Sequence, residues 1–176
     1  MIETLRLLLR ELQQEDLDDL VRLYADRRVI EFVGNGSPAE RSETEAWLGK
    51  TLAHRQEHGF GTWSIRLKTT GEFVGRAGLT VRDLEHGREV ELGYVLAAEH
   101  WHKGYATEAA AAIRDHAIQV LGLPRLIALI DPDNEASKRV AAKLGMIYER
   151  KVRFGSRWRE LGRTVDLYGL QIEPHG

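Results

Sequence analysis

The amino-acid sequence predicts a single α/β domain built from layers of helices and strands. Segments with alternating apolar residues are typical of strands, and segments with apolar residues three and four positions apart are typical of helices. The two kinds follow one another in the order β, α, α, β, β, β, α, β, α, β, β, which favours a mixed layer structure. The 176 residues contain no repeat, linker or low-complexity segment, so we expect one domain over residues 1–176.

Composition and charge exclude several classes of function. The chain has 25 Lys and Arg residues against 27 Asp and Glu residues, a formal net charge of −2, and no cysteine. This balance argues against direct binding of nucleic acid or of an anionic membrane. Without cysteine there is no disulfide framework, thiolate metal site or cysteine nucleophile. The first residues mix charge with leucine, unlike a signal peptide, so we expect a cytoplasmic protein.

The N-terminal third predicts one strand and two helices. Leu5, Leu7 and Leu9 recur at every second position, as in a strand with one buried face. Helical spacing follows over residues 17–24, and a second helix is expected over about residues 41–57. Acidic residues crowd the start of the first helix, where we expect them to be solvated and to match the positive end of the helix dipole. They are Glu15, Asp16, Asp18 and Asp19.

Three strands are expected in the middle of the chain, over residues 62–68, 73–82 and 89–96. The third strand alternates in a way that separates its side chains onto two faces. One face carries Val90, Leu92, Tyr94 and Leu96, and the other carries Glu91, Gly93 and Val95.

The rest of the chain predicts a helix, a strand, a helix and two strands. The first helix covers about residues 103–121, and the run 126–130 has no polar alternation, which suits a strand covered on both faces. The remaining segments are a helix over about residues 134–144 and strands near 147–154 and 164–172, which flank a turn at Gly155-Ser156.

The segment from Glu91 to Glu108 joins a strand, a short loop and the start of a helix. Unpaired N–H groups at a helix start can bind phosphate, and Gly104 lets the backbone approach closely. Such junctions occur several times in any α/β domain, so the pattern alone fits an ordinary connection as well.

Three sequence blocks resemble the GNAT acetyltransferase superfamily. The block Trp101-His102-Lys103-Gly104-Tyr105-Ala106-Thr107-Glu108 is similar to its pyrophosphate-binding signature, in the variant of the ribosomal-protein N-terminal acetyltransferases, a RimJ/RimL-like branch. His102 stands where glycine is common. The opening Thr4-x-Arg6-Leu7-x-Leu9-Arg10 and the segment 134–146 also match, in the family's order and over nearly the whole chain.

The resemblance implies a seven-stranded, mostly antiparallel sheet with helices on both faces. Two parallel strands would splay apart and form a cleft for acetyl-CoA. The backbone of Tyr94, Val95 and Leu96 would pair with the pantetheine arm, and the N–H of Val95 or Leu96 would polarise the thioester carbonyl. Asn134 would contact the same arm, or only cap its helix. The pyrophosphate would be held by His102, Lys103, Gly104, Tyr105, Ala106 and Thr107, mainly through backbone amides. No metal ion is implied.

The resemblance also suggests residues for direct transfer of an acetyl group to an amine. Glu91 corresponds in position to a strand glutamate that takes a proton from the substrate ammonium, directly or through water, and Glu89 offers a similar carboxylate. Either carboxylate could instead be a surface group. Many relatives use a tyrosine to assist departure of the CoA thiolate where this chain has Ala141. Ser137 could take that task, or could only bond its own helix.

The acceptor amine is open at this stage. In the family, the acceptor walls come from segments that correspond to residues 27–38 and 154–162, of which the second is rich in arginine. We expect transfer to a protein N-terminus or a small amine, with an antibiotic or amino acid as the nearer alternative. A non-catalytic CoA-sensing module is the more distant alternative, and a homodimer is plausible.

One motif competes with this interpretation. His54-Arg55-Gln56-Glu57-His58 matches the His-x-x-Glu-His pattern of a zinc peptidase. The sequence offers no identifiable third ligand, and Gly59 ends the helix at once. We therefore expect solvated histidines at a helix end and no metal site.

Overall fold

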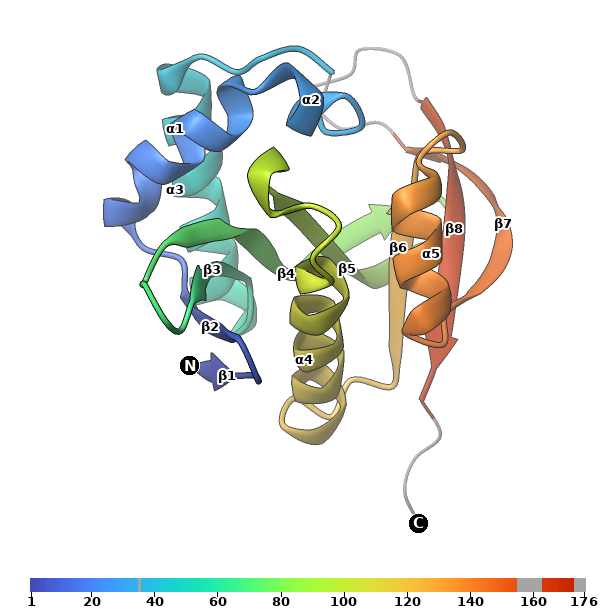
Figure 1. The fold of residues 1–176 in the computed structure, drawn as a ribbon. Helices are drawn as coiled ribbons and strands as arrows, with labels where there is room; N and C mark the ends of the chain where they lie inside the picture. Colours follow the sequence, from blue (N-terminus) through green and yellow to red (C-terminus); the bar gives the residue numbers. More distant parts are fainter. Residues whose placement is uncertain (35, 155–162, 173–176) are drawn as a thin grey trace.

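The structure is a computed structural model that describes residues 1–34, 36–154 and 163–172. Its strands form one eight-stranded sheet in the order β1-β2-β3-β4-β5-β6-β8-β7 (Figure 1). Neighbouring strands are antiparallel except β5 and β6, which are parallel. The strands are β1 Ile2–Glu3, β2 Leu7–Glu11, β3 Thr62–Leu67, β4 Phe73–Leu84, β5 Gly87–Leu96, β6 Arg125–Ile130, β7 Ile147–Phe154 and β8 Arg163–Gln171.

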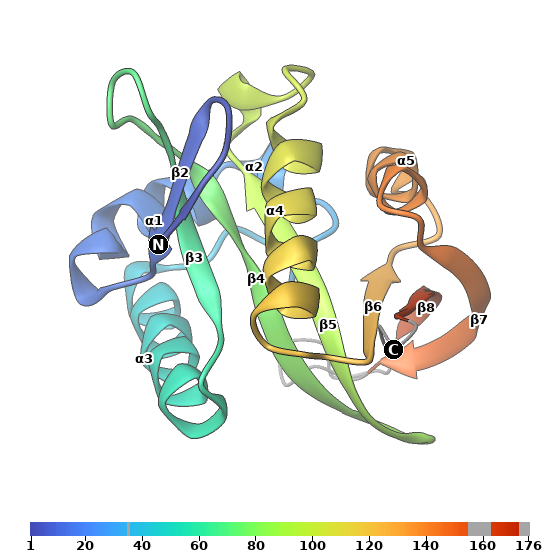
Figure 2. The same ribbon diagram turned by 90° about the horizontal axis from the view of Figure 1, so that it is seen from below.

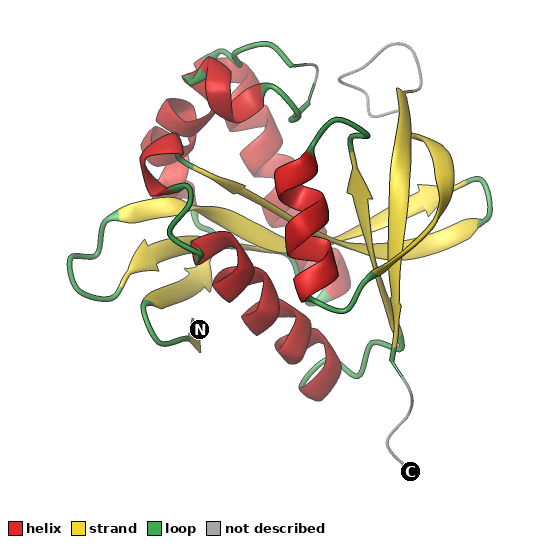
Figure 3. Cartoon of the chain, turned by 45° about the vertical axis from the view of Figure 1, so that its right-hand side comes forward, coloured by secondary structure: helices red, strands yellow, loops and turns green. Residues whose placement is uncertain are grey.

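Helices cover both faces of the sheet, as predicted. Figure 2 shows α1 and α3 on one side of the sheet and α4 on the other, and Figure 3 views the layer that contains α4 and α5. The helices are α1 Leu17–Ala25, α2 Arg27–Ile30, α3 Arg41–His58, α4 Tyr105–Gln119 and α5 Glu135–Lys143, with short 3₁₀ turns η1 Gln14–Asp16 and η2 Ala98–His100. No helix of the described ranges is both long and apolar enough to cross a bilayer.

The expectation of seven strands is wrong by one. The additional strand is β1, which has only two residues and pairs with β2 through Ile2 and Leu9. The chain folds back here because the Thr4 N–H donates to the Leu7 carbonyl oxygen at 3.0 Å and the Leu7 N–H donates to the Thr4 hydroxyl oxygen at 2.9 Å. A two-residue strand is too short to show alternation, so its sequence carries no strand signal.

Two apolar clusters hold the layers together and confirm the predicted faces of β5. The larger cluster lies between the sheet and α4 and α5, and it includes Leu92 and Leu96, with Val90 and Tyr94 packed against it. The smaller cluster joins α1, α2 and α3 to the sheet and includes Val95. Because one strand supplies both clusters, its backbone is fixed from both sides.

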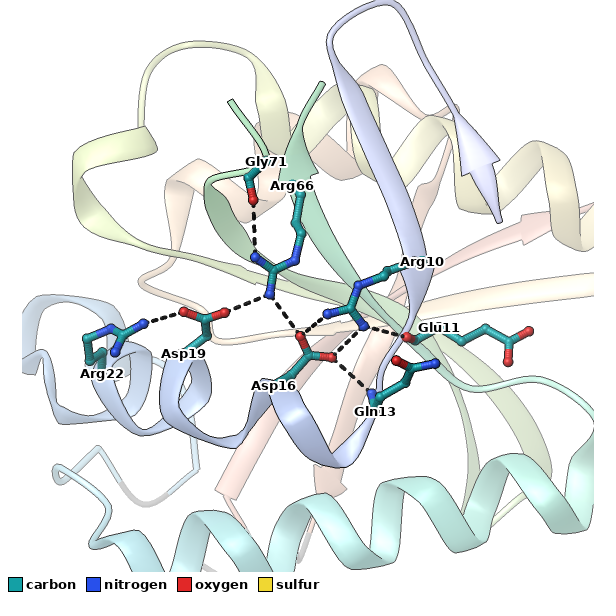
Figure 4. A network of polar contacts seen from close by, with 8 residues as sticks. All are labelled: Arg10, Glu11, Gln13, Asp16, Asp19, Arg22, Arg66 and Gly71. Carbon is teal, nitrogen blue, oxygen red and sulfur yellow. Dashed lines mark hydrogen bonds and ion pairs between the residues drawn. The ribbon is translucent and has the colours of Figure 1, made fainter. Parts of the chain in front are cut away.

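The expectation that the acids at the start of α1 are solvated is wrong for Asp16, which is 0% exposed. Its carboxylate accepts hydrogen bonds from Arg10 at 2.6 and 2.9 Å, from Arg66 at 3.0 Å and from the Gln13 N–H at 2.9 Å (Figure 4). Arg66 also binds Asp19 at 2.7 Å. The carboxylate is buried because two arginines from neighbouring strands neutralise it, so it joins α1 to β2 and β3.

Candidate functional site

The parallel strands β5 and β6 separate at the residue expected to be the base. Their pairing is limited to one register position, Glu91 opposite Ile127. Beyond Glu91, the edge of β5 that faces β6 has no parallel strand to bond with, so backbone groups at this edge are free for another partner. Tyr94, Val95 and Leu96 therefore lie where the two strands diverge.

Glu91 is held by an ion pair that the sequence did not reveal. Its side chain is 14% exposed, and its Oε2 accepts a hydrogen bond from Arg82 Nε at 2.5 Å. The alternative base, Glu89, binds Arg125 at 3.1 and 3.2 Å, and Arg125 in turn binds Glu149. Glu89 thus ties β5 to β6 below the point of divergence, whereas Glu91 lies at that point.

The Tyr94 side chain reaches across from β5 to α5. Its hydroxyl donates a long hydrogen bond of 3.5 Å to the backbone carbonyl oxygen of Ser137. Burial raises the pKa of the Tyr94 hydroxyl to about 12, so this group remains protonated and can act as a donor. The sequence analysis assigned Tyr94 only a backbone role. The fold also brings Tyr94 to Ser137, the residue proposed to assist the thiolate.

Asn134 serves as the N-cap of α5. Its side-chain oxygen accepts a hydrogen bond from the Ser137 N–H at 3.0 Å. This is the capping role that the sequence left as an alternative, and it leaves the side-chain amide nitrogen as a donor for another group. The Leu96 carbonyl oxygen accepts a hydrogen bond from the Trp101 indole at 2.9 Å, which fixes the end of β5 relative to the following loop.

The start of α4 has the geometry of an anion site. Gly104 is the N-cap, with a φ of 81°, and no side chain caps the helix. The first-turn N–H groups of Tyr105, Ala106 and Thr107 therefore lack intrahelical partners and point toward the loop, together with the positive end of the helix dipole. Each of these features suits a phosphate group.

The N-terminal motif Thr4-x-Arg6 fixes the start of α4. Glu108 accepts hydrogen bonds from the Thr4 hydroxyl at 2.5 Å, the Arg6 N–H at 2.8 Å and Arg6 Nε at 2.7 Å. Arg6 Nη1 also donates to the Lys103 carbonyl oxygen at 2.8 Å. The guanidinium lies 4.5 Å from the centre of the Tyr105 ring. Two motifs about 100 residues apart thus form one hydrogen-bond network, which holds the loop that precedes α4.

This hydrogen-bond network predicts that the free energy of unfolding depends on pH. Burial alone would raise the pKa of Glu108, but the hydrogen bonds from Thr4 and Arg6 outweigh it and lower that pKa. A carboxyl group with a lowered pKa stabilises the fold above its unfolded pKa of about 4.3, and this contribution is lost as the pH falls through the folded pKa. We expect Glu108→Gln to lower the free energy of unfolding at pH 7, and the deficit to shrink in acid. Denaturant unfolding at both pH values tests this, and a deficit independent of pH would contradict it.

His102 adopts a backbone conformation that favours glycine. Its φ is 59°, in the left-handed region, and it is the only non-glycine residue with a positive φ among the described ranges. The glycine that the resembled signature has at this position would adopt this conformation without strain. We expect His102→Gly to stabilise the fold by roughly 0.5–1 kcal/mol, because relief of strain exceeds the added freedom of the unfolded chain. Thermal unfolding measures the change, and a lower melting temperature would contradict it.

The two histidines of the His-x-x-Glu-His pattern take part in packing and hydrogen bonding within the fold. His54 Nε2 accepts a hydrogen bond from the Val81 backbone N–H at 3.0 Å, so this nitrogen binds β4. The rings of His54 and His58 lie 4.5 Å apart, and both pack near Phe60. The ranges 1–34, 36–154 and 163–172 contain no group of three or more potential metal ligands.

Some of the predicted acceptor walls lie outside the described residues. This applies to residues 155–162, which include the Gly155-Ser156 turn and part of the arginine-rich segment, and to residue 35 in the other wall. Within the described residues, sequence reasoning missed Arg82, which binds Glu91, and the Tyr94 hydroxyl, which lies beside Ser137. An alternating strand pattern gives the face of such residues, but it does not give the partner on another strand.

Comparison with known proteins agrees with this geometry. Residues 6–147 match the family described as acetyltransferase (GNAT) domain. The uncharacterized N-acetyltransferase p20 of Bacillus licheniformis is 30% identical over 169 residues, which cover 96% of this chain and 93% of that protein. Spermidine N(1)-acetyltransferase of Escherichia coli is 27% identical over 141 residues, which cover 80% of this chain and 73% of that protein.

Solved structures share the fold over almost the whole chain. An acetyltransferase from Agrobacterium tumefaciens superposes with a TM-score of 0.79 at 31% identity, covering 97% of this chain and 94% of that one. RimL, a ribosomal-protein alpha-N-acetyltransferase in complex with coenzyme A, superposes with a TM-score of 0.79 at 16% identity, covering 97% and 96%. The second similarity is one of fold alone.

Proposed function

Because the chain belongs to the GNAT acetyltransferase family, we propose that it transfers the acetyl group of acetyl-CoA directly to a primary amine. The observation that carries this proposal is the coincidence of three features at one place. The parallel pair β5 and β6 ends at Glu91, the uncapped start of α4 follows the same strand, and Ser137 of α5 lies beside Tyr94.

The chain's own groups fit acetyl-CoA as the donor. The N–H groups at the start of α4 would hold the pyrophosphate, with Gly104 allowing close approach and Lys103 adding a positive charge. The free edge of β5 at Tyr94, Val95 and Leu96 would pair with the pantetheine amides. Asn134 would donate its side-chain amide to the same arm.

The reaction then requires one new bond and one broken bond. The nitrogen of the neutral amine attacks the thioester carbon, a C–N bond forms, and the C–S bond breaks. Glu91 takes the first proton from the acceptor ammonium, directly or through water, to give this neutral amine, and the N–H of Val95 or Leu96 stabilises the oxyanion. The second proton that nitrogen loses on forming the amide passes to the departing thiolate. The thiolate accepts a hydrogen bond from Ser137 or from Tyr94. We add Tyr94 as a candidate donor because its hydroxyl lies beside α5, where Ala141 offers no donor.

The primary amine that accepts the acetyl group is a protein N-terminus or a small amine. Both types occur in the names of similar proteins, one a ribosomal-protein acetyltransferase and one a spermidine acetyltransferase. The proposal includes a cytoplasmic location. It also includes the possibility of a homodimer, and it assigns no role to a metal ion.

The test is an assay of the purified protein with acetyl-CoA and a panel of primary amines. Released thiol is measured together with the mass of the acetylated amine, and we expect equal amounts of the two products. Initial rates at varied concentrations of both substrates should give intersecting lines, because both must be bound at once. Binding of acetyl-CoA without turnover of any amine would support a CoA-sensing module instead, and parallel lines would contradict direct transfer.

A further inference from the structure

Arg76 is a half-buried arginine on β4 that has no acidic partner among the residues that the structure describes. Every other half-buried arginine of the described ranges lies within ion-pair distance of a carboxylate; they are Arg10, Arg55, Arg66, Arg82, Arg114 and Arg125. Arg76 instead donates from Nε to the Tyr24 hydroxyl at 2.9 Å. Since partial burial of a charge costs free energy unless an opposite charge compensates it, this exception calls for a partner that the described residues do not supply.

Aromatic rings hold the Arg76 guanidinium in place. Its central carbon lies 5.0 Å from the centre of the Trp47 ring and 5.9 Å from that of Tyr24, and the two rings meet edge to face at 5.4 Å. Tyr24 is only 6% exposed. This stacking orients the planar group and leaves its Nη donors for a ligand, and such a fork matches the two oxygens of a carboxylate.

Arg76 and Glu91 lie on the same face of the sheet. Arg76 is directly opposite Val95, and Thr80 of the same strand is directly opposite Glu91. Residues that face each other across two strands share a face, and four positions along a strand separate their Cα levels by about 13 Å. This face carries α1 and α3, and it is opposite to the one with α4 and its anion site.

The surface between these two residues is open at Gly93. Gly93 lies opposite Gly78, midway between Arg76 and Glu91. The space at Gly78 is taken by the backbone at the start of β3, since a Cβ added there would lie 2.5 Å from the Thr62 Cα. A Cβ added at Gly93 would meet no atom within 4 Å except Glu91 Oε1, at 3.9 Å, so there is open space above this residue. A ligand could therefore lie along β5 with one end at Glu91 and the other at Arg76.

We propose that the acceptor is an amine that carries a carboxylate, with the amine at Glu91 and the carboxylate bound by Arg76. This inference rests on the proposed function for the amine end only. Both ω-amino acids and peptides with an acidic residue close to the N-terminus have this chemistry. Polyamines, which offer a second positive charge to Arg76, are disfavoured.

The strongest argument for a polycationic acceptor, in place of one that carries a carboxylate, is a recess of about 270 Å³ beside α1. Its lining includes the carboxylates of Asp19, Asp26, Glu72 and Glu99. Arginines already neutralise two of them, since Asp19 binds Arg22 and Arg66 and Asp26 binds Arg28, while Glu72 lies 3.3 Å from His100. The recess also lies beside α1 and η2 and does not include Glu91 in its lining.

The test compares acceptors that differ only in the carboxylate. An ω-amino carboxylate series, the matching carboxamides, the plain alkylamines, acidic and neutral peptides, and spermidine are assayed with acetyl-CoA. For wild type, we expect kcat/KM to favour the carboxylate over its carboxamide by roughly 10- to 100-fold, as for a hydrogen bond between charged groups. The series and the peptides show whether the carboxylate comes from a small molecule or a polypeptide.

Two substitutions isolate Arg76. Arg76→Gln should abolish the preference through the KM of the acceptor, with the KM of acetyl-CoA unchanged, and Arg76→Lys should keep part of it. Arg88→Gln, at an exposed arginine at the far end of β5, is the matched control and should keep all of it. Thermal unfolding of each variant shows whether the packing against Trp47 and Tyr24 survives.

Calorimetry separates this inference from the proposed function. The same amino carboxylates are titrated into wild type and Arg76→Gln, each saturated with CoA. Binding that depends on Arg76 without any turnover would retain the carboxylate site and overturn the acetyltransferase proposal. Acetylation without a carboxylate preference, or a preference for spermidine, would overturn the carboxylate site. Absence of both turnover and binding would overturn both.

Discussion

Replacement of Asp16 by alanine is expected to cost about 3–5 kcal/mol of unfolding free energy, because it leaves buried positive charge without its partner. Asp16 is fully buried and binds both Arg10 and Arg66, so its loss affects β2, β3 and α1 together (Figure 4). In this variant Arg66 remains paired with Asp19, which limits the loss of stability at β3. Denaturant unfolding of the purified variant measures the loss.

Asp18 provides the matched control. It belongs to the same acidic segment, but its side chain is 68% exposed and pairs with Arg41 at the surface. We expect Asp18→Ala to change the unfolding free energy by less than about 1 kcal/mol. Equal effects of the two substitutions would show that burial of Asp16 does not stabilise this fold.

Replacement of Glu91 by glutamine is expected to lower kcat/KM for acetyl transfer by about 10²–10⁴-fold at neutral pH, the usual contribution of a general base. Without the base, only acceptor molecules that are already neutral can react. An alkylammonium group loses its proton near pH 10, so the residual activity should rise with pH and the optimum should move upward. The measurement is the pH profile of kcat/KM for wild type and variant.

Glu89 is the matched control for this prediction. It lies two residues earlier on the same face of β5, where Arg125 holds it away from the point of divergence. Glu89→Gln should keep the wild-type pH profile, even if the weakened contact with Arg125 lowers stability. A pH profile of Glu91→Gln that coincides with that of wild type would remove Glu91 from the reaction.

The sequence predicted the elements well because each carried a local signal. The alternation of Val90, Leu92, Tyr94 and Leu96 indicated both a strand and its buried face, and these side chains do pack toward α4 and α5. The uninterrupted run in β6 likewise predicted a strand covered on both sides. The sequence did not predict β1 because two residues carry no periodicity. Its pairing with β2 follows a turn that Thr4 stabilises.

Partners across the sheet could not be predicted in the same way. The acidic segment before α1 has the composition of a solvated helix start, and only the register of β2 and β3 brings Arg10 and Arg66 to Asp16. The ion pair of Glu91 with Arg82 depends on the register of β4 and β5 for the same reason. Arg76 is distinguished only by the absence of a described carboxylate nearby, which no local pattern can show.

The most direct test of the proposed acetyl-CoA site is the footprint of CoA on the backbone, measured by amide hydrogen exchange with and without saturating CoA. We expect added protection in residues 94–96 at the free edge of β5, in residues 102–107 at the start of α4, and in residues 134–137 at the start of α5. The edge strand β7, over residues 147–154, serves as the internal reference and should not change. Protection confined to other segments, or none at all under conditions where CoA binds, would contradict the assignment of this site.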